Sequence, residues 1–382
     1  MTMTFREMNL RVFERKPIPH VFFQPRFEPW YDWHRIFHCM PASLEHRSLL
    51  DVYDTLGVSM RTVHYYTGMP DPVVRQFDDA VKIRTQYRER EGTIVYETPH
   101  GELIEKVKRT QDETWRTVDF AVKSREDFPK LRWLYEHMTY HFDEAAFDQG
   151  DAYVGPRGWP QFWVPKSPYQ ALAQWWMRLE DLIYCLADCR AEVEDLLHAI
   201  DDAYDGLYEE LARHGVPGTG KLRILNFGEN LHEQLMSPRY FEKYFFPFYE
   251  KRVGQLRGAG IYTHVHLDGF FKHLLPMLRH LPFDGLEALT PLPQGDVTLE
   301  EMKEHIGDKI LLDGIPAVYF LPDYSREELM ECVEKVVDLF APNLVLGVSD
   351  EVPEGAPEEA IIRLQMVADY CRSRANTPAK ES

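Results

Sequence analysis

The sequence predicts an α/β protein whose strands run parallel, either as a barrel or as a doubly wound sheet. Short apolar runs alternate with longer segments that carry apolar residues at helical spacing, and this order favours parallel pairing. The chain has 382 residues, of which 44% are hydrophobic, so it can bury a large core and is long enough for a barrel with insertions. We expect strands at 19–24, 58–66, 222–227, 260–266, 284–289, 309–315 and 343–348. We expect helical segments at 169–213, 238–258, 270–281, 298–306, 325–341 and 357–374.

Local signals mark the beginning of several elements. Ser237 followed by Pro238 is typical of a helix start, and Ser325 with Glu328 three residues later forms a capping-box pattern. Residues 92–108 alternate around a Pro-His-Gly turn, which predicts a β-hairpin inserted between barrel units. The chain has no internal repeat and no linker long enough to separate domains.

The charge and cysteine content exclude several classes of partner. With 43 Lys and Arg against 62 Asp and Glu, the formal net charge is −19, so nucleic acids and anionic membranes are poor partners. The five cysteines have no CxxC or zinc-finger spacing, and we expect them to be reduced thiols. Because the start lacks a signal-peptide pattern and no run approaches about 20 apolar residues, we expect a soluble, cytoplasmic protein.

The most informative stretch is YTHVHLDG at 262–269. Side chains alternate along a strand, so His264, His266 and Asp268 share one face near the carboxyl end of an expected strand. Barrels and open α/β sheets place their sites at this end. Such a cluster can bind zinc or carry out acid–base chemistry. The alternative is that His264 is packed inside the barrel while Asp268 caps the next helix.

Acids also follow two other expected strands. Glu287 lies among Leu286, Ala288 and Leu289, where a carboxylate is costly to bury unless it is paired or coordinates a ligand. Asp350 follows the last expected strand. The alternative for each is a solvated loop carboxylate.

Polar residues near two further strand ends could bind a substrate. Asn226, Glu229 and Asn230 belong to the loop NFGEN, which could position a substrate or equally well cap a helix. Arg26 follows the first expected strand and could hold a carboxylate through paired hydrogen bonds, with an ordinary salt bridge as the alternative.

Aromatic residues are frequent after position 158. A planar or methylated-onium ligand would suit these rings through stacking or cation–π contacts. Packing between helices and barrel is the alternative explanation. The rings in question are Trp159, Phe162, Trp163, Tyr169, Trp175 and Trp176.

Taken together, these stretches resemble the uroporphyrinogen decarboxylase superfamily, whose (β/α)8 barrels include the porphyrinogen decarboxylase and methyltransferases that serve corrinoid proteins or coenzyme M. The likeness is clearest over 222–353, in NFGENLHEQLMSPRYFEKYFFPFY, HLDG, DGLEALTPLPQGDVTLEEMKEHIGDKILLDGIP and LVLGVSDEVPEGAPEE. It is weaker in PHVFFQPRF at 19–27, in ETPHGEL at 97–103 and in the helical region after 169. It implies a single α/β (β/α)8 TIM-barrel domain over 1–375 with an N-terminal helical extension, the hairpin insertion at about 92–108, and a flexible tail at 376–382.

The chain departs from both branches of that superfamily. Zinc methyltransferases of this type use a His-x-Cys pair and a later Cys, where this chain has His266-x-Asp268 and Gly347-Val348-Ser349. The porphyrinogen decarboxylase has an RQAGR motif and a late Gly-His-Gly, and this chain has QPRF and Gly-Val-Ser instead. Coproporphyrinogen chemistry and thiol activation are therefore disfavoured.

The resemblance implies a metal-dependent methyltransferase or demethylase. A divalent metal, with zinc as the first candidate, would be held by His266, Asp268, Glu287 and Asp350. The methyl group would pass from a small O- or N-methylated substrate to a corrinoid protein or a tetrahydrofolate-like acceptor. Reacting groups would be His266, Asp268, Glu229 and Arg26. Substrate contacts would come from Asn226, Asn230, His264, Trp159 and Arg157.

Two alternatives remain open. A lyase that decarboxylates a small acid would hold the carboxylate with Arg26 or Arg157 and protonate carbon with His266 or Asp268. A non-catalytic barrel that binds a corrinoid carrier would need none of these groups. A homodimer is compatible with the sequence in each case.

Overall fold

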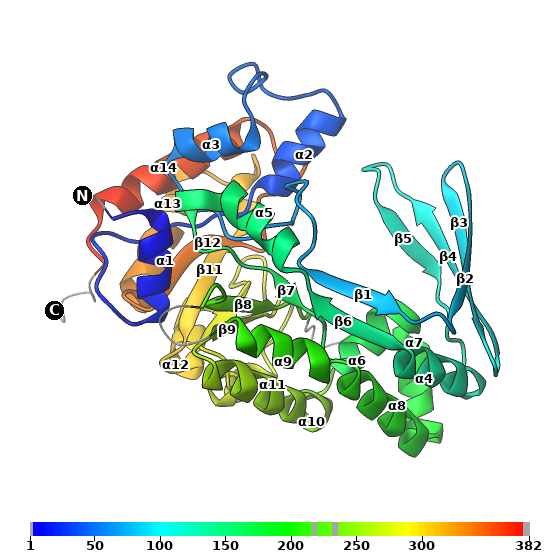
Figure 1. Ribbon diagram of the computed structural model, residues 1–382. Helices are drawn as coiled ribbons and strands as arrows, with labels where there is room; N and C mark the ends of the chain where they lie inside the picture. The colour runs from blue at the N-terminus through cyan, green and yellow to red at the C-terminus, as the bar shows by residue number, and fades with distance from the viewer. Residues whose placement is uncertain (1–2, 216–219, 231–235, 377–382) are drawn as a thin grey trace.

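The protein is an α/β structure built around one parallel sheet. The computed structural model describes residues 3–215, 220–230 and 236–376, so the expected flexible tail lies almost wholly outside the described residues (Figure 1). Within them, the parallel sheet has six strands in the order β12-β11-β10-β9-β8-β7. The bounds are β7 Trp163–Val164, β8 Ile224–Phe227, β9 Tyr262–His266, β10 Gly285–Glu287, β11 Ile310–Pro316 and β12 Leu344–Ser349. The five strands expected after position 220 are confirmed.

The two strands expected at 19–24 and 58–66 form only single bridges. Phe23 bridges Leu346 of β12, and Thr62 bridges Gln161 next to β7. Ser59 N donates to Phe23 O at 3.0 Å, so the two segments also meet each other. Pro25 has no N–H, so the bridge between Phe23 and β12 cannot be extended into a regular ladder of hydrogen bonds at this residue. The prediction of eight regular strands is therefore not met by the described residues, in which six parallel strands are regular and two bridging segments lie between β12 and β7.

Helices follow the strands as the periodicity predicts. After position 236 these are α10 Pro238–Tyr244, α11 Phe246–Gly258, α12 Leu299–Ile306, α13 Arg326–Phe340 and α14 Glu359–Ser373. The segment 270–281 holds a 3-10 helix, η4 Leu275–His280, instead of the expected α-helix, and η5 Ala317–Phe320 is a second short turn. The long segment 169–213 is divided into α6 Pro168–Ala171, the π-helical turn η3 Leu172–Trp176, α7 Leu179–Asp188, α8 Arg190–Asp202 and α9 Asp205–Arg213.

The capping box predicted at Ser325 is present at the start of α13. Ser325 Oγ accepts from Glu328 N at 3.1 Å, and Glu328 Oε2 accepts from Ser325 N at 2.7 Å. We expect Ser325→Ala to lower the free energy of unfolding by about 1 kcal/mol, because a backbone donor loses its partner. Urea unfolding measures this change. Ser124→Ala is the matched control, since Ser124 precedes a 3-10 turn without a side-chain cap. Equal stability of the two variants would contradict the prediction.

Helical elements also precede the parallel strands in the chain. They are α1 Phe5–Phe13, α2 Glu28–Ile36, α3 Leu49–Leu56, η1 Arg125–Asp127, α4 Phe128–Glu136, α5 Glu144–Val154 and η2 Gly155–Arg157. The first of them, α1, fits the expected N-terminal helical extension.

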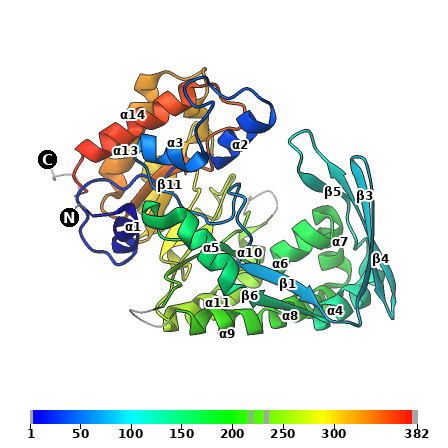
Figure 2. The same ribbon diagram turned by 45° about the horizontal axis from the view of Figure 1, so that its top comes forward.

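The expected hairpin is part of a larger insertion. Strands β3 Glu91–Thr98 and β4 Gly101–Arg109 pair around Pro99 and His100, which confirms the hairpin. They lie within an antiparallel sheet of four strands, completed by β2 Lys82–Arg88 and β5 Trp115–Asp119. A second antiparallel pair, β1 Val73–Phe77 and β6 Met138–Phe142, connects this sheet to the main body (Figures 1 and 2). The insertion therefore stands beside the parallel sheet as a separate layer.

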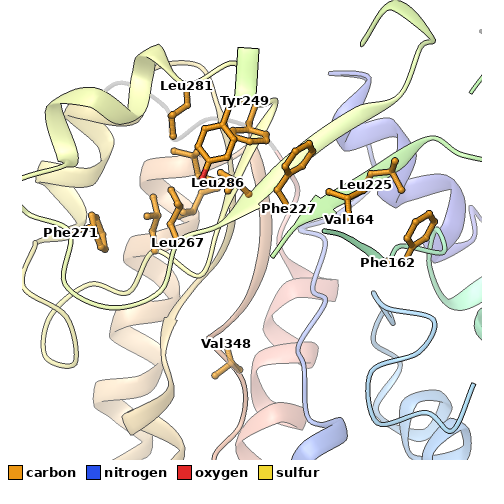
Figure 3. Close-up of a cluster of buried hydrophobic side chains, with 14 of the residues drawn as sticks. Phe162, Val164, Leu225, Phe227, Tyr249, Leu267, Phe271, Leu281, Leu286 and Val348 are labelled. Atoms are coloured by element: carbon orange, nitrogen blue, oxygen red, sulfur yellow. The ribbon is translucent and has the colours of Figure 1, made fainter. Parts of the chain in front are cut away.

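The core lies between the parallel sheet and its helices. Phe227 of β8 and Tyr249 of α11, which lie close together in Figure 3, both pack against Phe283, with ring centroids 5.0 and 4.9 Å from that of Phe283. Leu286 and Val348 are fully buried in the same cluster. All five cysteines are free thiols. Among the described residues, no helix is both long enough and apolar enough to cross a membrane.

Candidate active site

Polar side chains gather where neighbouring parallel strands end. In the register of the sheet, Asn226 of β8 lies beside His264 of β9, and His266 lies beside Glu287 of β10. The strand register thus brings together residues that lie up to 61 positions apart in the chain. The expectation that these side chains meet at the carboxyl ends of the strands matches this geometry.

Glu287 is the centre of the group. Its carboxylate lies 2.8 Å from Arg61 Nη1 and 2.8 Å from His264 Nδ1, and it accepts from Asn226 Nδ2 at 2.7 Å. Arg26 Nη1 is 3.6 Å away. Burial alone would raise the pKa of Glu287, but Arg61 and His264 outweigh burial and hold this pKa well below its usual range. Glu287 is therefore a buried anion that organises its neighbours.

Arg61, which the sequence analysis did not single out, is the main counter-ion. Its guanidinium is fully buried and pairs with Asp313 of β11 at 2.7 Å as well as with Glu287. Its Nε donates to Gln24 Oε1 at 3.0 Å. Each charge in the group thus has an opposite charge or a hydrogen bond, as buried ions require. The pattern ILLDGI, an acid within an apolar run, could have indicated that Asp313 is buried and paired. The sequence around Arg61 contains no such pattern.

Arg26 is committed to protein partners. Its Nη2 donates to the backbone carbonyl of Asp350 at 2.8 Å, and the same guanidinium forms a close ion pair with the Asp350 carboxylate. Only 3% of its side chain is exposed. The salt-bridge alternative is therefore present, but Arg26 also lines the cavity, so its role as a clamp for a substrate carboxylate stays a prediction.

The two histidines of β9 have different surroundings. His264 is fully buried. Its Nε2 lies 2.7 Å from Gln161 Oε1, and its Nδ1 faces Glu287. Burial lowers the pKa of His264, and the negative charge of Glu287 offsets part of this effect. His264 faces protein groups and is not among the residues that line the cavity. His266 lines the cavity, with its Nδ1 3.5 Å from Glu287 Oε1. Its Nε2 lies 3.7 Å from Asp350 and 4.0 Å from Asp268.

The loop after β8 supports the site from one side. Asn230 lines the cavity, and its side chain accepts from Lys166 Nζ at 3.0 Å and donates to Asp268 at 3.4 Å. Glu229 is buried behind it, where it accepts from Ser167 N at 2.6 Å and from Ser167 Oγ at 2.9 Å. Burial raises the pKa of Glu229, and Lys166 offsets part of this rise. Glu229 therefore holds the loop and does not line the cavity, unlike the reacting group predicted from the sequence, and Asn226 is likewise occupied by Glu287.

A cavity of about 670 Å³ lies above these residues, a size that suits a small-molecule ligand. One side of it is formed by the strand ends, through His266, Asp350, Asn230 and Lys166. Burial lowers the pKa of Lys166, a residue that the sequence analysis missed. The opposite side is formed by the insertion and η3. Six aromatic rings contribute to the lining: Tyr65, Tyr96, Tyr140, Trp163, Trp175 and Trp176.

Two residues predicted to contact substrate lie elsewhere. Trp159 packs under the Arg6 guanidinium, 4.6 Å from the ring centroid, and its backbone N donates to Asn9. Arg157 forms a two-bond pair with Asp54 at 2.6 and 2.7 Å. Neither residue lines the cavity. Trp159 was named for its aromatic ring and Arg157 for its charge, and neither property shows which end of β7 a residue occupies.

The residues predicted as metal ligands do not converge on one point. Glu287 is already neutralised by Arg61 and His264, and Asp350 by Arg26. His266 lies 3.5 Å from Glu287 through Nδ1, and 3.7 Å from Asp350 and 4.0 Å from Asp268 through Nε2, so the three acids face different nitrogens of one ring. In the part of the chain that the structure describes, no group of three or more His, Cys, Asp or Glu side chains could hold a metal ion. The donor set thus does not fit the divalent metal that the sequence led us to expect.

Comparisons with known proteins bear on the fold. No family model matches the chain, and no curated protein matches it. Among solved structures, it is similar to a methyltransferase from Methanosarcina mazei, with 12% identity over 96% of this chain and 99% of that chain and a TM-score of 0.60. A B12-independent methionine synthase from Shewanella sp. W3-18-1 has 12% identity over 88% of this chain and 91% of its own, with a TM-score of 0.45. The chain therefore shares the TIM-barrel-like α/β fold of the first of these proteins.

Proposed function

We propose that this chain is a methyltransferase that takes a methyl group from a small O- or N-methylated substrate. The observation that carries the proposal is His266, whose imidazole lines a cavity at the strand ends while its Nδ1 faces the buried anion Glu287. A ring held in this way presents its other nitrogen, Nε2, for proton transfer. The likeness in fold to a methyltransferase supports the reaction class by analogy alone.

In the proposed reaction, an acceptor forms a bond to the methyl carbon as the bond between that carbon and the substrate oxygen or nitrogen breaks. The electron pair of the broken bond stays on the oxygen or nitrogen. His266, in its doubly protonated form, gives the Nε2 proton to that atom, so the product leaves as a neutral alcohol or amine. Asp268 and Asp350 lie next to the same nitrogen and orient the ring.

The acceptor that we propose is a corrinoid carried by a partner protein or a tetrahydrofolate. Either would have to reach the methyl carbon from the side of the cavity opposite His266. Because the protein donors do not fit a divalent metal, no step depends on one. We also propose that the two bridging segments and the six parallel strands together form a closed ring of eight, which would fix the spacing of the site.

The direct test incubates purified protein with a panel of O- and N-methylated small molecules and either acceptor, and measures the methylated acceptor by mass spectrometry. We expect methyl transfer to at least one acceptor. Release of carbon dioxide from small carboxylic acids, without methyl transfer, would replace the proposal with the lyase. Binding of a corrinoid protein without any turnover would replace it with the carrier-binding barrel.

Metal content gives an independent check on the donor set. Elemental mass spectrometry of the wild type and of Asp268→Asn should find no stoichiometric divalent metal in either protein, because Glu287 and Asp350 are occupied by arginines. Stoichiometric metal in the wild type that is lost in Asp268→Asn would contradict this expectation and restore the metal-dependent mechanism.

A further inference from the structure

The wall of the cavity formed by the insertion carries an arginine without an ion-pair partner. Arg75 of β1 lines the cavity and lies over the Trp176 ring, 5.9 Å from its centroid, and over Phe77 at 5.4 Å. It forms no ion pair with a carboxylate among the described residues, whereas Arg26 and Arg61 are both paired. In a chain with 62 acidic and 43 basic residues, an unpaired guanidinium facing a cavity is available for an anionic ligand.

Tyr140 of β6 lies directly beside Arg75. The two residues are opposite each other in the antiparallel pair of β1 and β6, so their side chains share one face. Tyr140 is 6% exposed and lines the same cavity, and its hydroxyl lies near Arg75, Tyr135 and Tyr204 without a well-formed hydrogen bond to any described residue. Burial raises the pKa of Tyr140, with Arg75 offsetting part of the rise, so the hydroxyl keeps its proton at neutral pH and can donate. A buried donor without a partner is costly unless a ligand satisfies it.

The remaining lining limits what the ligand can be. The indoles of Trp163, Trp175 and Trp176 present flat apolar surfaces, which suit a planar ring. Glu105 also lines the insertion side, where it accepts from Thr117 at 2.7 Å and from Tyr96 at 3.5 Å. Because this carboxylate lies on the same side as Arg75, a ligand with one negative charge fits better than a doubly charged phosphate.

We infer that Arg75 and Tyr140 bind a single carboxylate on a planar, aromatic substrate, and that the substrate class of the enzyme is therefore the methylated aromatic monocarboxylic acids. The guanidinium and the phenol hydroxyl donate to the carboxylate oxygens, the ring lies among the indoles, and the methylated oxygen or nitrogen points toward His266. This assignment rests on the proposed function for the reaction, but the binding subsite stands on its own geometry.

Tryptophan fluorescence can measure binding directly, since three indoles line the cavity. The probe is 4-methoxybenzoate, and its neutral comparator is 4-methoxybenzyl alcohol. We expect saturable quenching by the acid in the wild type and a loss of affinity of about tenfold or more in Arg75→Gln and in Tyr140→Phe, because each variant removes a hydrogen bond to a charged group. Arg75→Lys should recover part of the affinity. The affinity for 4-methoxybenzyl alcohol should be the same in the wild type, in Arg75→Gln and in Tyr140→Phe.

Arg84→Gln is the matched control, because it removes the same charge from the insertion at a residue that pairs with Glu97 and Glu102 away from the cavity. We expect this variant to bind the acid as the wild type does. Equal affinity of the wild type and Arg75→Gln for the acid, or no quenching by the acid at all, would overturn the subsite.

The same probe separates this inference from the proposed function. If the acid binds through Arg75 in the wild type and in His266→Ala, but no methyl transfer is found with either acceptor, the subsite holds and the proposed reaction fails. If methyl transfer occurs and Arg75→Gln leaves the KM for acidic and neutral donors unchanged, the reaction holds and the subsite fails.

Discussion

Replacing His266 with alanine is expected to lower the rate of methyl transfer at least about 100-fold, the usual range for loss of a positioned general acid. The imidazole lines the cavity while its Nδ1 faces Glu287, which makes it the general acid of the proposed reaction. The measurement is the initial rate of acceptor methylation at saturating donor. The loss should appear in kcat, because the proton is transferred in the chemical step and the binding groups are intact.

A surface histidine provides the control for this prediction. His198 lies on the exposed face of α8, so His198→Ala should keep the wild-type rate. His266→Ala should also unfold at nearly the same urea concentration as the wild type, since its ring borders a cavity. A rate within a few-fold of the wild type in His266→Ala would remove this residue from the mechanism.

Replacing Glu287 with glutamine is expected to cost about 3–5 kcal/mol of unfolding free energy. The change removes the charge that Arg61 faces at 2.8 Å and Arg26 at 3.6 Å, and both guanidinium groups stay almost completely buried. The free energy of unfolding of a domain is typically about 5–15 kcal/mol in total, so the variant should unfold at a much lower urea concentration than the wild type. Glu97→Gln, which breaks an exposed pair with Arg84, should change stability by about 0.5 kcal/mol or less.

The loss of unfolding free energy caused by Glu287→Gln should depend on pH. The pKa of Glu287 in the folded protein lies well below its ordinary value. Its stabilisation is therefore complete above the unfolded pKa of about 4.3 and is lost as pH falls through the lower folded pKa. The difference between wild type and variant should be constant from neutral pH down to about pH 5 and should shrink below that. A difference that grows as the solution becomes more acidic would contradict the assigned pairing.

The parallel strands after position 220 were predictable because each is a short, buried apolar run between long amphipathic segments. The insertion was only half predictable. Strands β3 and β4 alternate in polarity around a turn. The sequence KIRTQYR of β2 alternates too, but every residue of this strand is exposed, so no buried apolar face marks it as a strand. The strand expected at 58–66 contains Arg61, whose side chain turns inward to Asp313 and Glu287 instead of leaving a regular apolar face.

The residues of the site were predictable where they lie at the carboxyl end of an expected strand. His266 ends the strand expected at 260–266, Asp350 follows the strand expected at 343–348, and both line the cavity. The ion pair between Arg61 and Asp313 joins residues 252 positions apart, and neither partner reveals the other in one sequence. Arg157 was named for its charge alone, and its pair with Asp54, 103 positions earlier in the chain, could not be read from the sequence.

The β1 and β6 ribbon has a consequence for how this scaffold can change over evolution. The residues that would recognise the ligand, Arg75 and Tyr140, are on this ribbon, while His266 and Glu287 are on the parallel sheet more than 120 positions later in the chain. Mutations in the ribbon and its sheet can therefore alter ligand preference while the proton-transfer pair keeps its buried counter-ions. Homologues with the same His266 and Glu287 but different ribbon residues would form a natural series of enzymes that share one reaction and differ in their substrates.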